Sequence, residues 1–417
     1  MTAGLAGAAS RTARRECAAW VVALVAVAVL LAASRYESRD PDSALYAAIS
    51  TDLAARPLAE WIAPEWNGHW TLEGLYREHP VGVFVPPAAV ARLGYPPQQA
   101  AYFVNAIYEV LTLLLMLALA REFLTWRDSR LLVSLLLLLP IAFAYRIRAN
   151  QEQPLLMFLL AALYGLERSR ASLKWAAIST AGLAGLFVVK GVFVVVAIAA
   201  AVTWLGFRQW WRPGQPGRLR PWLALAMGIA AIAAIYFVYD VIYAGVVGEP
   251  FFRWYWARQF GVAVAAGTPH PVRGALYSMV WYLARIAWFA APWSAVGVVG
   301  LWRGVRRLRR AWDARSETRS HDRAVAGALF CAIMSLVYLL ALSAFERRAD
   351  RYIFPVYFFV AAWWAAYAFR LQPALKRLAW RASRALYPYE QVALWFGTVL
   401  LAMAAPSLGL PDIKMWR

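Results

Sequence analysis

Residues 187–205 read FVVKGVFVVVAIAAAVTWL, an apolar run that is interrupted by a single lysine, Lys190. Three further apolar runs, Val21–Ala33, Leu111–Ala120 and Leu131–Ala144, occur in the same chain. Such runs are typical of membrane-spanning helices, because a bilayer core about 30 Å thick requires roughly 20 helical residues. With 62% hydrophobic residues, the 417-residue chain has more apolar surface than one soluble core could bury. The sequence therefore predicts an all-α polytopic membrane protein.

We expect about eleven spans. They are placed at 17–34, 101–120, 131–145, 154–166, 175–189, 191–206, 222–243, 281–301, 325–344, 352–369 and 391–406. Lys190 and Gly191 then form an outer turn between two spans, or the tip of one re-entrant unit. The first run is not a secretory signal, because residues 35–40 carry no small-residue cleavage pattern and many spans follow.

The net charge of +20 is explained by the membrane topology. If the N-terminus is cytoplasmic, most of the 43 Lys and Arg residues fall in cytoplasmic segments, and residues 303–323 are the densest basic stretch. This is the positive-inside asymmetry of membrane proteins, so no nucleic acid is needed as a partner. Only four basic residues are lysines, which favours a GC-rich, bacterial coding sequence. We expect a bacterial inner-membrane protein with a cytoplasmic N-terminus and an extracytoplasmic C-terminus.

The domain prediction is a single transmembrane unit, 1–417, with no separate soluble C-terminal domain. Its long polar first outer loop, 35–100, would hold the active site, and 245–280 would be a second large outer loop. Shorter outer segments are expected at 146–153 and 346–351. A helix over Ser43–Ala54 would lie flat on the membrane as an amphipathic interfacial helix. Its apolar positions recur at helical spacing and would face lipid: Leu45, Ala48, Ile49 and Leu53.

The first outer loop supplies the candidate acid and base groups. Asp40 and Asp42 stand two residues apart beside a helix start, where carboxylates can bind a metal ion or remove a proton from an acceptor. The alternative is that Asp42 caps the helix. Glu78 and His79 could likewise bind a metal or relay protons, or be hydrogen-bonded loop scaffolding. The two Cys residues have no metal-binding spacing and form no disulfide framework.

Candidate phosphate ligands lie in the later outer segments. Arg148 could bind phosphate oxygens, and Glu152 begins a span, where a carboxylate is costly unless it is paired or functional. The alternative is an Arg148–Glu152 ion pair at the helix end. Lys190 could contact phosphate or snorkel to the membrane surface. Arg351 lies in an outer segment with three arginines, which an anionic ligand or pairing with first-loop acids would hold there.

The order of these motifs resembles a known superfamily. In chain order they are Asp42-x-x-x-Tyr46, Asn67-Gly68, Glu78-His79-Pro80, Arg148-x-x-x-Glu152-x-Pro154-Leu155, Lys190-Gly191 and Arg351-Tyr352-x-x-Pro355. This order and common sidedness resemble the polyprenol-phosphate-sugar-dependent C-type glycosyltransferases. Within them, the branch is that of bacterial protein O-mannosyltransferases and lipid A aminoarabinose transferases. The resemblance covers about residues 17–370.

The resemblance implies transfer of a sugar from a polyprenyl-phosphate donor to a lipid, glycan or protein acceptor on the extracytoplasmic face. It places the loop aspartate at Asp42, the second acidic residue at Glu152, where Asp is more usual, and the Lys-Gly lysine at Lys190. The usual Thr-Lys-Gly-Pro reads Val-Lys-Gly-Val here, and Glu78-His79-Pro80-Val81 replaces a Lys-Pro-Pro or His-Pro-Pro. Inversion at the sugar carbon is a further expectation from the family.

The sequence therefore predicts a membrane glycosyltransferase with Asp42 as base and Glu152 as a second catalytic carboxylate. Lys190, Arg351 and Arg148 would hold the donor phosphate, where they stabilise the leaving group. The supporting residues would be Asp40, Tyr46, Glu78, His79 and Tyr352. A divalent metal ion is the cofactor that these carboxylates could hold. The alternative function is a polytopic transporter or lipid flippase, although such a protein should show internal repeats and ionisable residues at mid-membrane.

Overall fold

The computed structural model describes residues 2–66, 74–211, 217–264, 271–292, 294, 321–345, 348–371 and 373–405. Within these ranges the protein is helical throughout, and its β-structure is one isolated bridge between Glu65 and Leu75. The helices are α1 (Thr2–Ala33), α2 (Pro41–Ala55), α3 (Val85–Arg92), α4 (Pro97–Arg121), α5 (Trp126–Leu136), α6 (Pro140–Tyr145), α7 (Glu152–Ser169), α8 (Ala176–Trp211), α9 (Arg220–Val247), α10 (Phe251–Val264), α11 (Pro271–Phe289), α13 (His321–Ser343), α14 (Phe354–Leu371), α15 (Pro373–Arg384) and α16 (Glu390–Ala404). Short 3-10 turns occur at Leu58–Glu60, Val81–Val83 and Leu173–Trp175.

The predicted all-α membrane architecture is confirmed. In the described part of the chain, five helical segments are long and apolar enough to cross a bilayer: Thr12–Ala33, Pro97–Arg121, Leu173–Trp211, Arg220–Val247 and Val325–Ser343. Shorter apolar helices occupy Val81–Arg92, Phe354–Ala365 and Glu390–Ala404. The count of eleven spans stays a prediction.

Two predicted spans have different bounds in the structure. Residues 131–145 are divided into α5 and α6, because the chain leaves the helix at 137–139, just before Pro140. The span predicted at 281–301 belongs to α11, which begins at Pro271, inside the segment predicted to be an outer loop. The rest of that loop is also largely helical, since α10 covers Phe251–Val264. The residues from 295 to 301 lie outside the described ranges.

A helical hairpin in α8 turns at Lys190, as the sequence predicts. Lys190 has non-helical angles (φ −157°, ψ 78°) between two helical segments. Both segments meet the same end of α7: a side chain at Gly165 would collide with Ser179, and the Trp204 indole donates a 2.5 Å hydrogen bond to Glu167. The chain therefore runs along α7, reverses at Lys190 and returns. This brings Lys190 beside the other end of α7, near Glu152.

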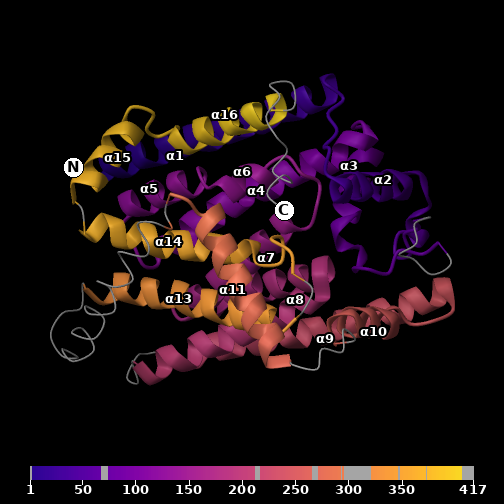
Figure 1. Ribbon diagram of the computed structural model, residues 1–417. Coiled ribbons are helices and arrows are strands. Elements are labelled where there is room, and N and C mark those ends of the chain that lie inside the picture. The colour runs from indigo at the N-terminus through magenta and orange to yellow at the C-terminus, as the bar shows by residue number, and fades with distance from the viewer. Residues whose placement is uncertain are drawn as a thin grey trace.

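The prediction that the apolar positions of α2 face lipid is wrong for Ile49 and Leu53. Both are fully buried, because α2 packs against α3 and α4, whereas Leu45 is partly exposed and Ala48 is exposed. The apolar stripe of a helix can pack against lipid or against protein. Here it packs against protein, because the first loop also contains α3, which covers α2. The helices α2 and α3 lie together at one end of the bundle, and the N-terminus and α15 lie at the opposite end (Figure 1).

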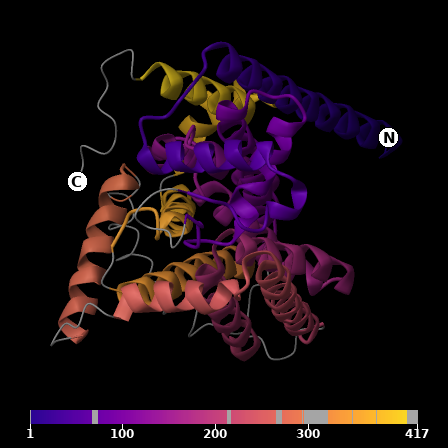
Figure 2. The same cartoon turned by 90° about the vertical axis from the view of Figure 1, so that its right-hand side faces the viewer.

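A buried ion cluster fastens the end of the bundle that carries the N-terminus. The Arg130 guanidinium donates to Glu390 at 2.6 Å and to Glu16 at 2.9 Å, which joins α5, α16 and α1. Arg130 is fully buried and pairs with both carboxylates, so loss of Arg130 would leave two glutamates without their cation. Figure 2 shows α1 and α16 side by side, where this cluster joins them.

Candidate active site

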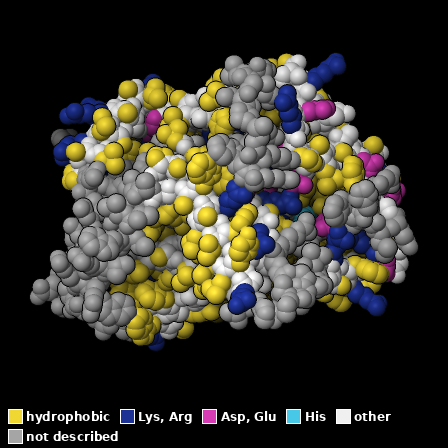
Figure 3. Space-filling model, in the orientation of Figure 1, with side chains coloured by type: hydrophobic (Ala, Val, Ile, Leu, Met, Phe, Trp, Pro, Cys, Tyr) yellow, Lys and Arg dark blue, Asp and Glu magenta, His cyan; other side chains and the backbone are white. Residues whose placement is uncertain are grey.

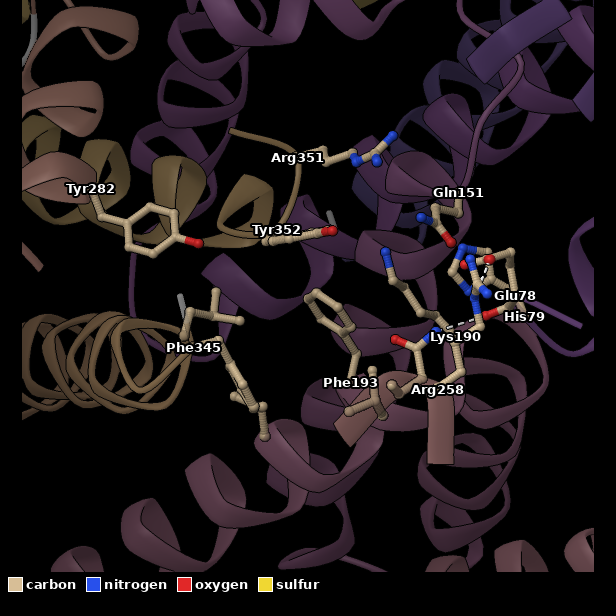
Figure 4. Close-up of a pocket in the computed structure, with 14 residues that line it drawn as sticks. Glu78, His79, Gln151, Lys190, Phe193, Arg258, Tyr282, Phe345, Arg351 and Tyr352 are labelled. Carbon is tan, nitrogen blue, oxygen red and sulfur yellow. Dashed lines mark hydrogen bonds and ion pairs between the residues drawn. The ribbon is translucent and has the colours of Figure 1, made fainter. Parts of the chain in front are cut away.

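A cavity of about 110 Å³ lies where α8, α10, α11 and α13 meet the first loop and the segment before α14. Its polar and charged lining comes from Glu78, His79, Gln151, Lys190, Arg258, Gln259 and Arg351, and its aromatic lining from Phe193, Tyr282, Phe345 and Tyr352. Figure 4 shows Lys190 between Phe193 and the Glu78–His79 pair, with Tyr352 and Arg351 across from it. The cavity therefore combines cations, a carboxylate and apolar walls.

Lys190 is buried in this cavity. Its side chain is only 4% exposed, and the Nζ atom lies 4.8 Å from the ring centre of Phe193 and 4.9 Å from that of Tyr352. The residue stands at the hairpin turn, where its backbone leaves the helical conformation. Snorkelling to the membrane surface is therefore the wrong interpretation of Lys190. A buried ammonium between two aromatic faces is a strong site for an anion.

Arg351 joins the cavity to the first loop. Its guanidinium forms an ion pair with the Asp42 carboxylate, although 309 residues separate them in sequence. Pairing with a first-loop acid was one of the two explanations for an arginine in this outer segment, and it is observed. Arg351 also lines the cavity. Asp42 does not line the cavity, and its connection to the cavity is the ion pair with Arg351.

Asp40, not Asp42, caps the helix. The helix begins at Pro41, and the Asp40 carboxylate accepts 3.0 Å hydrogen bonds from both the backbone N–H and the hydroxyl of Ser43. Asp42 lies within the first turn, where its negative charge favours the helix dipole. The N-cap interpretation of Asp42 is therefore wrong. Its carboxylate, 43% exposed, pairs with Arg351 instead.

Arg148 belongs to a group of contacts, here called the clasp, that joins Asp40 and Ser43 of the first loop to residues 148 and 149. Its Nη1 atom lies 3.8 Å from Asp40 Oδ1, and the backbone N–H of Ala149 donates a 3.2 Å hydrogen bond to Ser43 Oγ. The clasp fastens the start of α2, which carries Asp42, to the segment that leads into Glu152. Arg148 is not among the residues that line the cavity, and its ion pair is with Asp40.

Glu152 is a buried carboxylate in the first turn of α7. Its side chain is 2% exposed, and Oε2 has no hydrogen-bond partner among the residues that the structure describes. The favourable charges around it are those of Arg351 and Lys190. Glu152 and Asp42 therefore flank Arg351, and both anions share one cationic neighbour.

Aromatic rings support the remaining predicted residues. The Tyr46 ring lies 6.5 Å from that of His79 and 5.2 Å from that of Phe84. Burial raises the pKa of Tyr46 well above its ordinary value, so its hydroxyl stays protonated. Glu78 forms an ion pair with Arg258, and Gln259 donates a 2.9 Å hydrogen bond to the Glu78 backbone carbonyl.

Arg258 and Gln259 are site residues that the sequence analysis does not single out. They lie on α10, which folds from a predicted outer loop over the first loop. Gln151, next to Glu152, is a third lining residue of this kind. The only sequence signal for Arg258 is a basic residue that closely follows the aromatic stretch at 251–256.

The described side chains do not form a metal cage. Among them, no three His, Cys, Asp or Glu residues come close enough to hold one metal ion. Glu78 is paired with Arg258, and Asp40 is engaged with Ser43. These donor groups do not fit a metal centre, and the chemistry proposed below uses none.

The clasp yields a prediction for stability. Asp40→Ala should lower the free energy of unfolding by about 1 kcal/mol or more, because an N-cap and a buried contact to Arg148 are lost together. Asp40→Asn should retain most of it, since Asn caps about as well. Thermal unfolding of the purified protein in detergent measures both. The control is Asp52→Ala on the same helix, which removes only an exposed pair with Arg56. Equal melting temperatures for Asp40→Ala and Asp52→Ala would contradict the clasp.

Basic side chains also gather on the surface near the cavity end. On the face in Figure 3, Lys and Arg side chains lie together near the middle, beside acidic side chains. Elsewhere on this face, hydrophobic side chains cover much of the described surface. A charged group surrounded by apolar surface is the arrangement that an amphiphilic ligand would require.

Comparisons with known proteins identify relatives for the sequence and the fold. Residues 78–239 match the model of the dolichyl-phosphate-mannose-protein mannosyltransferase family. ArnT from Cupriavidus metallidurans, solved bound to undecaprenyl phosphate, has a TM-score of 0.65 at 17% identity, over 94% of this chain and 77% of that one. The archaeal oligosaccharyltransferase AglB from Archaeoglobus fulgidus, solved with an inhibitory peptide and a dolichol-phosphate, has a TM-score of 0.57 at 14% identity, over 96% of this chain and 56% of that one. No curated protein sequence matches significantly.

Proposed function

We propose that this chain, whose residues 78–239 match the dolichyl-phosphate-mannose-protein mannosyltransferase family and whose fold is similar to that of ArnT, uses Asp42, Lys190 and Arg351 for sugar transfer from a polyprenyl-phosphate donor at the extracytoplasmic end of the bundle. The resemblance predicted from the sequence motifs is confirmed, and so is the class of enzyme. The family match favours this enzyme over the alternative of a transporter or flippase. The acceptor, the base and the orientation in the membrane are part of the proposal.

The observation that carries the proposal is the convergence of Lys190 and Arg351 on one cavity with apolar walls. A polyprenyl-phosphate sugar has a charged phosphodiester between a lipid tail and a polar sugar. Two cations beside Phe193 and Tyr352 suit that phosphate, and the apolar lining suits the first part of the tail. Arg258, which also lines the cavity, would neutralise further charge if Glu78 released it.

The proposed reaction moves one sugar and one proton. The acceptor hydroxyl or amine attacks the anomeric carbon of the sugar, and the bond from that carbon to the phosphate oxygen breaks. The polyprenyl phosphate leaves with an additional negative charge, which Lys190 and Arg351 stabilise. Asp42 accepts the proton of the acceptor. Attack from the face opposite the phosphate would invert the sugar carbon.

The Asp42–Arg351 pair gives this reaction an order. While Arg351 holds the Asp42 carboxylate in an ion pair, that carboxylate is not available to the acceptor. A donor phosphate beside Lys190 competes for the Arg351 guanidinium, and its charge would free Asp42 for the acceptor. Glu152, behind Arg351, would balance the cations as the phosphate leaves and is the second catalytic carboxylate of the proposal. Donor binding then precedes acceptor activation.

The other predicted residues act through these groups. Asp40 and Arg148 position Asp42 through the clasp, and Tyr352 forms the wall beside Lys190. Tyr46 packs against His79, which lines the cavity from the first loop. We propose that the cavity end lies outside the inner membrane. In that orientation the densest basic stretch, 303–323, is cytoplasmic, as the positive-inside rule favours. The N-terminus is then cytoplasmic and the C-terminus extracytoplasmic.

The direct test is donor turnover. Purified protein in detergent is incubated with a panel of polyprenyl-phosphate sugars and an acceptor mixture of membrane lipid and peptide, and the sugar transferred to the acceptor is measured together with the polyprenyl phosphate released. We expect transfer with at least one sugar, and no transfer when the same sugars are linked to a nucleoside diphosphate. Transfer from nucleotide sugars alone would contradict the proposed donor class.

A further inference from the structure

A basic amphipathic helix, α15, lies at the end of the bundle opposite the cavity (Figure 1). It spans Pro373–Arg384 between α14 and α16, and none of its side chains is buried. Its sequence contains four basic residues and no acidic residue. It takes no part in the proposed reaction, so its composition needs another explanation.

The side chains of α15 form two stripes, one apolar and one basic, and a flank between them. Leu375, Leu378, Ala379 and Ala382 recur at helical spacing and form an apolar stripe. Arg377, Arg381 and Arg384 are exposed and lie on the opposite side of the helix. The flank between the stripes is fixed to α5. There Lys376 Nζ lies 2.6 Å from Asp128 Oδ1, and the Arg127 guanidinium lies 4.1 Å from the Trp380 ring centre.

These contacts fix how α15 presents its faces. Ala379 packs against the hydrophobic core at one edge of the apolar stripe, and the flank that α5 holds keeps Leu378 and Ala382 of the same stripe at the surface. Leu378, which follows Arg377, is therefore 66% exposed. An exposed apolar stripe opposite three arginines is typical of a helix at a membrane surface, where acyl chains take the stripe and headgroups take the charges.

We propose that α15 is a binding surface for anionic phospholipid, with its apolar stripe in the acyl region and Arg377, Arg381 and Arg384 among the phosphate headgroups. Charge complementarity selects this occupant, since each basic residue near an anionic membrane surface favours binding. The position also fits, because the flanking helices α14 and α16 are apolar elements of the bundle. The proposal depends on the membrane fold and not on the enzyme activity.

The first test measures the depth of α15 in the bilayer. Leu378→Cys carries a fluorescent label in a background of Cys17→Ser and Cys331→Ala, and Arg377→Cys on the opposite stripe is the matched control. The proteins are reconstituted in vesicles of phosphatidylcholine and phosphatidylglycerol in equal parts. We expect lipids brominated on their acyl chains to quench the label at 378, and aqueous iodide to quench the label at 377. Equal iodide quenching at both positions would overturn the proposal.

The second test measures the preference for anionic lipid. The label at 378 is quenched by brominated phosphatidylglycerol and, separately, by brominated phosphatidylcholine. The excess quenching is the quenching by brominated phosphatidylglycerol minus that by brominated phosphatidylcholine. We expect it to fall by about half or more in R377Q/R381Q/R384Q, because each arginine should contribute about a fivefold preference for the anionic lipid. The matched control R35Q/R39Q/R253Q removes three exposed arginines far from α15 and should keep the excess. An equal loss in both triple variants, or in neither, would overturn the anionic-lipid assignment.

Discussion

Lys190→Met should weaken binding of a polyprenyl-phosphate sugar about ten- to a hundredfold. Losing one charge-assisted contact to a phosphate corresponds to roughly 1.5–3 kcal/mol, which is that range of affinity. Met keeps the length of the side chain and its contacts with Phe193 and Tyr352, so the variant removes the charge and little else. Binding is measured by titration of the donor onto the purified protein.

The matched control for Lys190 is Lys174→Met. Lys174 is an exposed lysine beside Trp175, at the other end of α7 from the cavity, and its loss should leave donor affinity unchanged. Thermal stability separates binding from structure in the Lys190 variant. Lys190 is one of two cations beside the buried Glu152, so its loss should lower the melting temperature, and donor affinity is compared at a temperature where the variant is fully folded. Unchanged donor affinity in both variants would make Lys190 a packing residue of the hairpin rather than a phosphate ligand.

The Lys190 turn shows what the sequence can predict. A charged residue and a glycine in an apolar run are enough to predict a reversal at that point, and α8 does reverse there. The length of an apolar run predicts a helix well, because the whole run must be buried in protein or face lipid. It does not fix where a helix begins, as the early start of α11 at Pro271 shows.

The N-cap of α2 shows a local signal that the sequence analysis does not use. Proline is favoured at the first position of a helix, so Pro41 indicates that the cap is Asp40 rather than Asp42. The Asp42–Arg351 pair has no such local signal, because it joins residues 309 apart. The same is true of Arg258, whose contact with Glu78 depends on how α10 folds over the first loop. Pairs of this kind require the tertiary structure.

Asp42→Asn should reduce turnover about a hundredfold or more, because an amide cannot accept the proton of the acceptor. Stability should change little. The N-cap of α2 is Asp40, so the substitution leaves the cap intact and removes a charge in the first turn together with a partly exposed ion pair to Arg351. Steady-state release of polyprenyl phosphate measures turnover. Asp52→Asn, on the same helix, is the matched control and should retain wild-type activity.

A second readout distinguishes a base from a residue that only holds Arg351. If Asp42 merely pairs with Arg351, its loss frees a cation for the donor phosphate, so donor affinity rises while the chemical step keeps its rate. If Asp42 is the base, the rate of a single turnover at saturating donor falls, whatever happens to donor affinity. Single-turnover rates and donor affinities measured on Asp42→Asn therefore separate the two roles. A wild-type single-turnover rate would remove Asp42 from the chemistry and leave Glu152, the other carboxylate beside Arg351, as the base to test.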